Sequence, residues 1–224
     1  MLYPASPLIL ILFLAGIAIL SYLFGSVNFA IVWTRVFLHD DIRKYGSGNA
    51  GMTNVLRTVG KGAAALTLLG DIAKGVLSVL VAQLVFTLLI PDPFFCVLAK
   101  YLAAFGALMG HLFPLYYGFK GGKGVAVSAG AMLMLAPWVF LCCLGVFLLA
   151  VVLTRYVSLG SILSAVAYPV FIFLFGFFWT PHPYWVLETA CAAVLGIIVI
   201  AMHHENIGRL IHGTERKIGE KKEK

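Results

Sequence analysis

Two glycine-rich segments of the chain combine a permissive backbone with polar and cationic side chains. The first spans residues 41–57, and its glycines at positions 46, 48 and 51 have the spacing G-x-G-x-x-G. A dinucleotide fingerprint needs a preceding strand and a βαβ unit, which the apolar neighbours of this segment do not predict. Glycines still allow successive backbone N–H groups to converge on an anion. Arg57 can add a bidentate phosphate contact.

The polar side chains of this first segment offer further hydrogen-bond donors to the same anion. They are Ser47, Asn49, Thr53 and Asn54. An alternative interpretation is an ordinary polar loop followed by a helix whose start is capped by Thr53. The segment alone leaves both interpretations open.

The second glycine-rich segment covers residues 110–124 and contains Lys120-Gly-Gly-Lys123-Gly. It is not a Walker A loop, because the spacing from Gly118 to Lys123 is one residue too short. In addition, Gly124 replaces the Ser or Thr that would hold Mg²⁺. A lysine between glycines that leads into a helix N-terminus nevertheless favours phosphate binding. An ordinary positively charged membrane loop is the alternative.

A third polar segment, residues 202–215, follows the last apolar run of the chain. If this segment is helical, His203 and Asn206 lie three residues apart and share a face. Both side chains could then contact one substrate at the membrane surface. A solvated helix beside the membrane is the alternative.

Two further pairs of polar residues lie in or beside apolar runs. Asp71 and Lys74 are three residues apart inside such a run, where ionisable groups face the protein interior and can pair with each other. Ser158 and Ser161 follow Arg155 and could point their hydroxyls toward the same surface as the loops. Either serine could equally bond back to its own helix.

The segments that position these residues must lie within a lipid bilayer. Of the residues, 62% are hydrophobic and only 11% are charged, and the mean hydropathy is +1.00. A soluble domain has roughly a quarter of its residues charged. This composition excludes a cytosolic enzyme, a secreted disulfide scaffold and a disordered regulator. The four cysteines show no CxxC spacing and no Cys/His cluster, so we expect small apolar side chains rather than disulfides or a metal site.

Apolar segments of sufficient length predict seven transmembrane helices, since one crossing takes about 20 helical residues. Residues 125–153 are too long for one crossing and short for two, and we expect a break at Pro137. The predicted segments are 8–29, 63–90, 94–117, 125–136, 137–153, 157–178 and 184–202. The first is expected to be retained, because the N-terminus lacks the basic region of a cleaved signal peptide.

With seven crossings, fourteen of the sixteen Lys and Arg residues fall on one side of the membrane. The remaining two, Lys74 and Lys100, lie inside predicted spans. The positive-inside rule assigns the basic side to the cytoplasm. We therefore expect an all-α integral membrane protein, a single polytopic domain over residues 1–224, with the N-terminus outside and the C-terminus inside. All three polar segments then share the cytoplasmic face, which suggests a phosphate-bearing substrate.

Long stretches of the chain resemble a known family. GSGNAGMTNVLRTVGK, GHLFPLYYGFKGGKGVA and HHENIGRLIHGTERKIG resemble the three signature segments of the bacterial acyl-phosphate:glycerol-3-phosphate acyltransferases (the PlsY family), and RYVSLGSI resembles a further stretch. The resemblance implies a seven-helix enzyme of the bacterial inner membrane whose active site faces the cytoplasm. It would transfer a fatty acyl group from acyl phosphate to the 1-hydroxyl of glycerol 3-phosphate. The products would be lysophosphatidic acid and phosphate, in the first step of phospholipid synthesis.

The resemblance also implies site residues by position. The implied catalytic residues are Ser47, Arg57, Lys123, His203 and Asn206. The implied substrate-binding residues are Gly48, Asn49, Gly51, Thr53, Lys120 and the serine pair Ser158 and Ser161, between which the match does not choose. No metal and no cofactor are implied, and functional coupling to the enzyme that makes acyl phosphate is expected. The general base would be His203 or a substrate phosphate oxygen.

Two other functions are compatible with cationic loops on a membrane protein. A transporter for an organic phosphate is disfavoured, because the chain has no internal repeat. An acyltransferase that uses acyl-CoA or acyl carrier protein is also disfavoured, since none of the six histidines begins the H-x-x-x-x-D motif of that class.

Overall fold

The computed structural model describes residues 6–220, and these residues form helices and loops with no strand among them. The described part therefore lacks the βαβ unit that a dinucleotide fingerprint requires. Three tail lysines that the topology prediction counts lie outside the described residues: Lys221, Lys222 and Lys224. The chain divides into two compact units, Met1–Leu135 (unit 1) and Ala136–Lys224 (unit 2). The single domain predicted for residues 1–224 stays a prediction.

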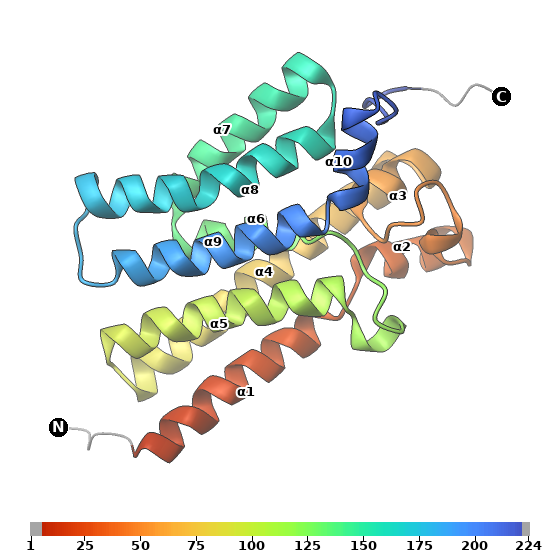
Figure 1. The fold of residues 1–224 in the computed structure, drawn as a ribbon. Helices are drawn as coiled ribbons and strands as arrows, with labels where there is room; N and C mark the ends of the chain where they lie inside the picture. The colour runs from red at the N-terminus through yellow and green to blue at the C-terminus, as the bar shows by residue number, and fades with distance from the viewer. Residues whose placement is uncertain (1–5, 221–224) are drawn as a thin grey trace. The chain divides into compact units, whose positions relative to one another are not determined.

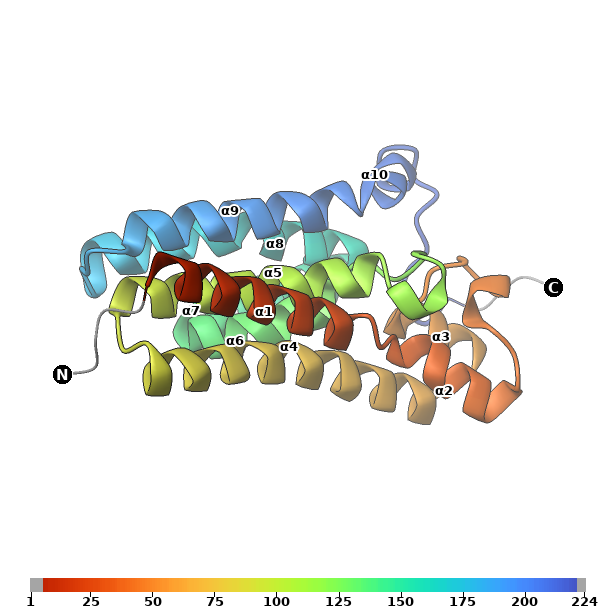
Figure 2. The same cartoon turned by 90° about the horizontal axis from the view of Figure 1, so that it is seen from below.

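Four helices form the body of unit 1: α1 (Pro7–Gly25), α4 (Lys61–Leu89), α5 (Pro93–Leu112) and α6 (Val125–Leu135). α5 packs against both α1 and α4, and α6 packs along α4. α1 and α5 run in the same direction and α4 runs the opposite way (Figures 1 and 2). The C-terminal ends of α1 and α5 and the start of α4 therefore lie at one end of the unit.

Prolines and caps determine where several of these helices begin. The Asp92 carboxylate accepts a hydrogen bond from the Phe94 N–H at 2.9 Å, and Pro93 occupies the first turn of α5. α6 ends at Leu135, and Pro137 is the first residue of the next helix. The helix break expected at Pro137 is therefore confirmed.

Shorter elements gather at the end of unit 1 where α1 and α5 finish (Figure 2). They are α2 (Phe29–Leu38), η1 (Ile42–Lys44), α3 (Met52–Thr58) and η2 (Leu115–Tyr117). Ile31, Ile42, Ala50 and Val55 are fully buried in one apolar cluster, and Tyr117 packs against it. This cluster holds both glycine-rich segments at the same end of the unit.

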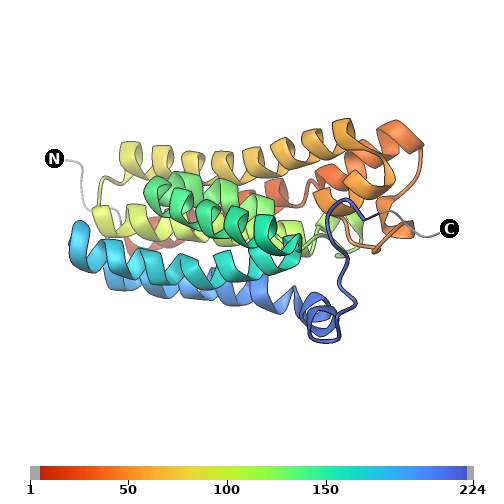
Figure 3. The same ribbon diagram turned by 90° about the horizontal axis from the view of Figure 1, so that it is seen from above.

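Unit 2 contains three long helices, α7 (Pro137–Thr154), α8 (Val157–Leu174) and α9 (Trp185–Ala201). α8 packs against both of the others, and it continues into a π-helical turn, η3 (Phe175–Trp179) (Figure 3). α9 is followed by α10 (His204–Ile211) after a bend of 60°. The α7–α8 turn and α10 therefore lie at the same end of this unit.

Five helical segments within residues 6–220 are long and apolar enough to cross a membrane, or six if the bent α9–α10 pair is one span. Large apolar side chains point outward from them, including Leu88 and Trp138, each 70% exposed. The protein is thus an all-helical, multi-pass integral membrane protein. The 11 residues of α6 extend about 17 Å. This is little more than half of the roughly 30 Å of hydrocarbon in a bilayer. A seventh crossing stays a prediction.

Candidate functional site

The first glycine-rich loop is wrapped around the side chain of Asn54. Asn54 is 3% exposed, and its Nδ2 donates to the carbonyl oxygens of Tyr45 at 2.9 Å and Asn49 at 3.0 Å. Its Oδ1 accepts a hydrogen bond from the Ser47 N–H at 3.1 Å. The sequence predicts Asn54 as a possible donor to an anion, but these bonds are all internal and fix the course of the loop.

Two glycines of this loop adopt backbone conformations that other residues rarely adopt. Gly46 has φ of 60° and Gly48 has φ of 71°, both in the left-handed region. A Cβ at Gly46 would also collide with Oδ1 of Asn54. The glycines are therefore needed for the tight path of the loop around Asn54.

The helix after the first loop begins earlier than a cap at Thr53 would require. α3 starts at Met52 with Gly51 as its N-cap, and no side chain caps this start. Thr53 lies inside the first turn, so the alternative of a helix start capped by Thr53 is wrong. Arg57 lies in the last turn of α3 and is exposed.

The predicted site residues of the first loop differ in exposure. Ser47 and Gly48 are exposed, while Asn49, Gly51 and Thr53 are half-buried. The exposed part of the loop is thus its glycine-containing tip, and the donors behind it are partly covered.

The second glycine-rich loop folds back on the C-terminal end of α5. The Gly121 N–H donates to the Leu112 carbonyl at 3.0 Å, and the Gly122 N–H donates to the His111 carbonyl at 3.2 Å. Lys123 follows directly, is half-buried, and lies two residues before the start of α6. These backbone hydrogen bonds therefore fix the position of Lys123 near the end of the loop.

Lys123 also stands at the N-terminus of a helix. The first helical bond of α6 joins the Ser128 N–H to the Gly124 carbonyl at 2.9 Å. The N–H groups of the first turn have no acceptor within the helix. Together with the helix dipole they favour an anion beside Lys123. Lys120 is exposed.

Arg43 joins the two loops of unit 1. Its Nη1 donates to the carbonyl oxygens of Tyr117 at 2.6 Å and Lys120 at 3.1 Å, both in the second loop. Its Nη2 lies 2.7 Å from Oδ2 of Asp41. The Arg43 guanidinium lowers the pKa of Asp41, and the Asp41 carboxylate raises the pKa of Arg43. This link was not predicted, because its only signal in the sequence is an arginine two residues from an aspartate.

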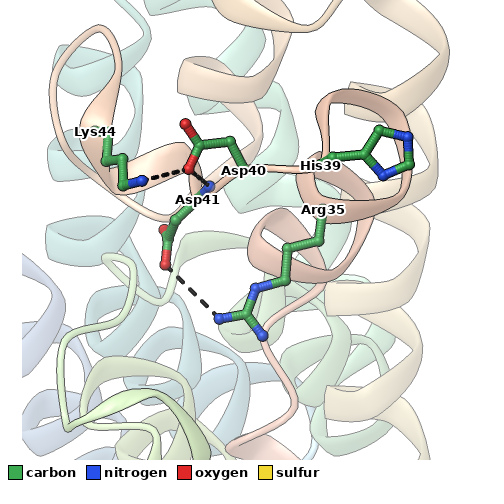
Figure 4. A pocket seen from close by; sticks show the side chains of 5 residues that line it. All are labelled: Arg35, His39, Asp40, Asp41 and Lys44. Atoms are coloured by element: carbon green, nitrogen blue, oxygen red, sulfur yellow. Dashed lines mark hydrogen bonds and ion pairs between the residues drawn. The ribbon is translucent and has the colours of Figure 1, made fainter.

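An open hollow of about 430 Å³ lies on unit 1, lined by Arg35, His39, Asp40, Asp41 and Lys44 (Figure 4). Lys44 Nζ is 2.6 Å from Asp40 Oδ1, and Arg35 Nη2 is 4.0 Å from Asp41 Oδ2. The hydrogen bond from Lys44 is the main cause that lowers the pKa of Asp40 to about 2. The cations of this hollow are thus paired with carboxylates, and none of the predicted site residues lines it.

In unit 2, one carboxylate connects two of the predicted site residues. Oε1 of Glu215 accepts hydrogen bonds from Ser158 Oγ at 2.8 Å and Asn206 Nδ2 at 2.7 Å, and Oε2 accepts one from Arg209 Nε at 2.7 Å. Burial raises the pKa of Glu215, but the bonds from Arg209, Asn206 and Ser158 outweigh burial and lower it overall. Glu215 is not among the predicted site residues, although it lies within the third signature segment.

The two serines of α8 have different partners. Ser161 Oγ donates to the Val157 carbonyl of its own helix at 3.0 Å. Ser158 instead shares the Glu215 carboxylate with Asn206. Of the two serines, Ser158 is therefore the one that contacts the third signature segment.

His203 is 3% exposed and lies at the bend between α9 and α10. Its Nδ1 is 2.7 Å from the Val199 carbonyl oxygen. A carbonyl can only accept, so Nδ1 carries the proton of this bond and the lone pair of the neutral ring lies on Nε2. His203 is the N-cap of α10, so it and Asn206 flank a helix start rather than sharing the face of one continuous helix.

Each unit therefore assembles its own group of polar residues. In unit 1, the loop that carries Ser47 and the loop that carries Lys123 are held together, and in unit 2 Ser158 and Asn206 share Glu215. No group of three or more His, Cys, Asp or Glu side chains within residues 6–220 is arranged to hold a metal ion. The fold and these groups define a helical membrane protein whose cationic, glycine-rich loops suit phosphate groups.

Comparison with known proteins extends this description. The sequence model of a family described as glycerol-3-phosphate acyltransferase matches residues 15–213. The glycerol-3-phosphate acyltransferase of Clostridioides difficile (strain 630) is 45% identical over 211 residues, which cover 92% of this chain and 96% of that protein. The enzyme of the same name from Neisseria meningitidis serogroup A is 42% identical over 203 residues, 90% of this chain and 96% of its own length.

Solved structures agree with the sequence comparisons. The crystal structure of PlsY (YgiH), an integral membrane glycerol 3-phosphate acyltransferase, in its glycerol 3-phosphate form has a TM-score of 0.78 and 33% identity to this chain. The match covers 92% of this chain and 96% of that one. The lysophosphatidic acid form has a TM-score of 0.75 and 32% identity, with 92% and 95% covered.

The chain therefore belongs to the glycerol-3-phosphate acyltransferase family, the PlsY family. The resemblance inferred from the signature segments is confirmed. The predicted enzyme class, glycerol-3-phosphate acyltransferase, and the predicted product, lysophosphatidic acid, are confirmed with it.

Proposed function

We propose that this protein uses acyl phosphate as the donor of the acyl group that it transfers to the 1-hydroxyl of glycerol 3-phosphate. The proposal is supported mainly by the contact between the two glycine-rich loops of unit 1. In this contact, Arg43 of the first loop donates a hydrogen bond to the Lys120 carbonyl of the second loop. Both substrates of this reaction carry a phosphate, and these loops offer backbone N–H groups and cations suited to anions. The solved PlsY structures in glycerol 3-phosphate and lysophosphatidic acid forms support the acceptor and the product.

In this proposal the two loops hold the substrate phosphates. Ser47 and the amides of Asn49 and Ala50 donate to phosphate oxygens, with Thr53 beside them. The N–H groups of Gly48 and Gly51 instead donate to the Tyr45 and Asn49 carbonyls and hold the loop in shape. Arg57 and Lys123 supply the main positive charges, and Lys120 adds to them. From unit 2, Ser158, His203 and Asn206 contact the glycerol phosphate.

The reaction needs no covalent intermediate on the protein, because an acyl phosphate is already activated. The hydroxyl oxygen of glycerol 3-phosphate forms a bond to the acyl carbonyl carbon, and the bond from that carbon to the phosphate oxygen breaks. The hydroxyl proton passes to Nε2 of His203 or to a phosphate oxygen, and phosphate leaves. The protein accelerates these steps by holding the two anions close together and by stabilising the charge on the carbonyl oxygen.

We also propose that the chain crosses a bacterial inner membrane seven times, with the N-terminus outside and the site facing the cytoplasm. The short helix α6 makes one of these crossings together with the loop before it. That loop is bonded to the end of α5 through Gly121 and Gly122. An irregular backbone at membrane depth is tolerated where protein covers it. The acyl chain would enter sideways from the bilayer, and an enzyme that makes acyl phosphate would supply the donor.

The donor is tested with the purified protein in detergent. We expect phosphate release and lysophosphatidic acid formation from palmitoyl phosphate plus glycerol 3-phosphate, and no product from palmitoyl-CoA. Product from palmitoyl-CoA alone would overturn the proposed donor. Uptake of glycerol 3-phosphate into proteoliposomes without acyl transfer would instead support a transporter.

The phosphate-binding roles are tested with Lys123→Ala and Arg57→Ala. Removal of a group that stabilises developing charge costs about 10²–10³-fold in rate, and we expect losses of that order in each variant. Lys61→Ala is the matched control, because Lys61 is an exposed cation at the start of α4 outside both loops. Near-normal activity in both loop variants would refute the assignment of Arg57 and Lys123.

A further inference from the structure

Three polar side chains of unit 1 form a buried cluster that the proposed reaction does not use. Asp71 and Lys74 of α4 and His111 of α5 are 1%, 0% and 3% exposed. Asp71 and Lys74 do pair, as the sequence allowed, at 2.9 Å, and His111 completes the cluster. Burying ionisable side chains inside a membrane protein costs free energy, and such residues usually have a function. A buried cluster of three therefore indicates a role beyond packing.

Lys74 is the centre of this cluster. Its Nζ lies 2.9 Å from Oδ1 of Asp71, 2.9 Å from Nδ1 of His111, 3.0 Å from the Gly25 carbonyl and 2.8 Å from the Val27 carbonyl. An ammonium group has three hydrogens, which go to His111, Gly25 and Val27. Asp71 Oδ1 is an ion-pair neighbour that accepts no hydrogen bond within residues 6–220. Lys74 therefore ties α4 to the chain that leaves α1 and to α5.

The contact between Lys74 and His111 determines which ring nitrogen carries the proton. Two nitrogens 2.9 Å apart need a lone pair on one of them, and an ammonium has none. Asp71 is the counter-ion of the Lys74 ammonium. Nδ1 of His111 therefore accepts, and the ring is neutral with its hydrogen on Nε2.

The Nε2 edge of His111 faces the lysine loop. A Cβ at Gly122 would collide with His111 Nε2 and would lie 2.7 Å from the Ala50 carbonyl oxygen of the first loop. The same Ala50 carbonyl accepts a hydrogen bond from Asn28 Nδ2 at 3.2 Å. His111, Gly122 and Ala50 therefore meet at one point, where the second loop lies against the first.

We propose that Asp71, Lys74 and His111 are positioning residues of the acyltransferase, which set the spacing between the first glycine-rich loop and Lys123. Asp71 and Lys74 hold the His111 ring with its Nε2–H toward Gly122, and the backbone of His111 bonds to the same glycine. The proposal rests on the proposed function, since it concerns the same phosphate-binding loops. An anion site whose donors are fixed in advance needs no reorganisation during the reaction.

The test compares two substitutions of His111 that keep different parts of the ring. The amide nitrogen of His111→Gln reaches the place of Nε2, whereas that of His111→Asn reaches the place of Nδ1. We expect His111→Asn to lower kcat/KM for glycerol 3-phosphate by about 10²-fold, the effect of misplacing a group by about 1 Å. We expect His111→Gln to stay within about tenfold of the parent protein.

A second variant, Asp71→Leu with Lys74→Met, removes both charges together. Replacing a buried ion pair by apolar side chains of similar volume often leaves a protein as stable as before. Here the Gly25 and Val27 carbonyls also lose their Lys74 donor, so we expect the double variant to melt below the parent in detergent. At a temperature where both proteins are folded, it should lose at least about tenfold in kcat/KM. Ser78→Ala is the control, because Ser78 is buried one turn further along α4 and its hydroxyl has no hydrogen-bond partner among the described residues. It should keep full activity.

Hydrogen exchange over residues 118–124 gives a readout that needs no substrate. We expect faster exchange in His111→Asn and in the double variant than in the parent or in Ser78→Ala. Equal activity and equal loop exchange in His111→Asn and His111→Gln would overturn the positioning role, as would full activity in the double variant. If the parent failed to use acyl phosphate, the proposed donor would fail, and loop exchange would still decide the role of the cluster.

Discussion

At the scale of single residues, His203 combines deep burial with a defined ring orientation. Its Nδ1–H donates to the Val199 carbonyl at 2.7 Å, which leaves the Nε2 lone pair as the basic site of the neutral ring. A general base needs such a lone pair within hydrogen-bond reach of the attacking hydroxyl. The orientation is therefore the one that proton transfer to Nε2 of His203 would require, and transfer to a substrate phosphate oxygen is the other proposed route.

We accordingly expect His203→Ala to lower kcat by about 10²–10⁴-fold with little change in KM. Steady-state kinetics with palmitoyl phosphate and glycerol 3-phosphate would measure both constants. The control is His204→Ala, since His204 is the exposed neighbour and bonds locally, to the Ala201 carbonyl. If kcat were retained while KM rose, His203 would position the substrate, and a phosphate oxygen would take the proton.

At the scale of elements, Glu215 ties three parts of unit 2 together. Its carboxylate bonds to Ser158 at the start of α8 and to Asn206 and Arg209 on α10. Nearby, the Ile218 N–H donates to the Arg155 carbonyl at 2.8 Å, so the tail also runs back to the α7–α8 turn. Ser158 and Asn206 are thus linked through the Glu215 carboxylate, whose side chain is 9% exposed.

Glu215→Gln should therefore loosen α10 from α8, because an amide NH₂ group cannot accept the bond from Arg209. Hydrogen bonds to charged groups contribute about 1.5–3 kcal/mol each, so we expect a lower melting temperature in detergent and reduced activity. Glu205→Gln is the control. The Glu205 side chain is 65% exposed and its Oε2 lies 3.7 Å from Arg209 Nη1, and an exposed ion pair of this kind contributes little to stability. If both variants melted alike, the carboxylate would not hold these elements together.

The same contact predicts a pH dependence with a definite sign. The pKa of Glu215 is lower in the folded protein than its ordinary value of 4.5. Its contribution to stability is therefore complete above pH 4.5 and is lost as the pH falls through the lowered pKa. The difference in melting temperature between the parent and Glu215→Gln should be largest near neutral pH and should shrink on acidification below pH 4.5.

At the scale of the whole molecule, the proposed topology places the glycine-rich loops and the turn at His182 on opposite sides of the membrane. After replacement of the four native cysteines by alanine, Lys61→Cys and His182→Cys supply one reporter on each side. With a membrane-impermeant maleimide, we expect His182→Cys to react in right-side-out vesicles and Lys61→Cys only after permeabilisation. Labelling of both reporters from the same side would show that the proposed topology is wrong.

Much of the helix framework follows from residue types alone. Long apolar runs between prolines, glycines and charges predicted where the spanning helices lie, and a proline inside a 29-residue run predicted the break at Pro137. The pairing of Asp71 with Lys74 also follows from their spacing on one helix, because residues three apart share a face. The signature segments identified the family from local sequence.

Other features depend on which helix faces meet, and local sequence carries little information about this. Most of the spanning helices are apolar on all sides, because lipid surrounds them, so no polar face indicates their orientation. The contact of His111 with Lys74 joins residues 37 positions apart, and that of Glu215 with Ser158 joins residues 57 apart. The polar segments and the family were determined by the sequence itself. Tertiary packing decided three other features: Asn54 shapes its own loop, Glu215 joins Ser158 to Asn206, and the buried Lys74 bonds to the chain that leaves α1. The physical reason is that each buried polar group must find a partner wherever the fold supplies one.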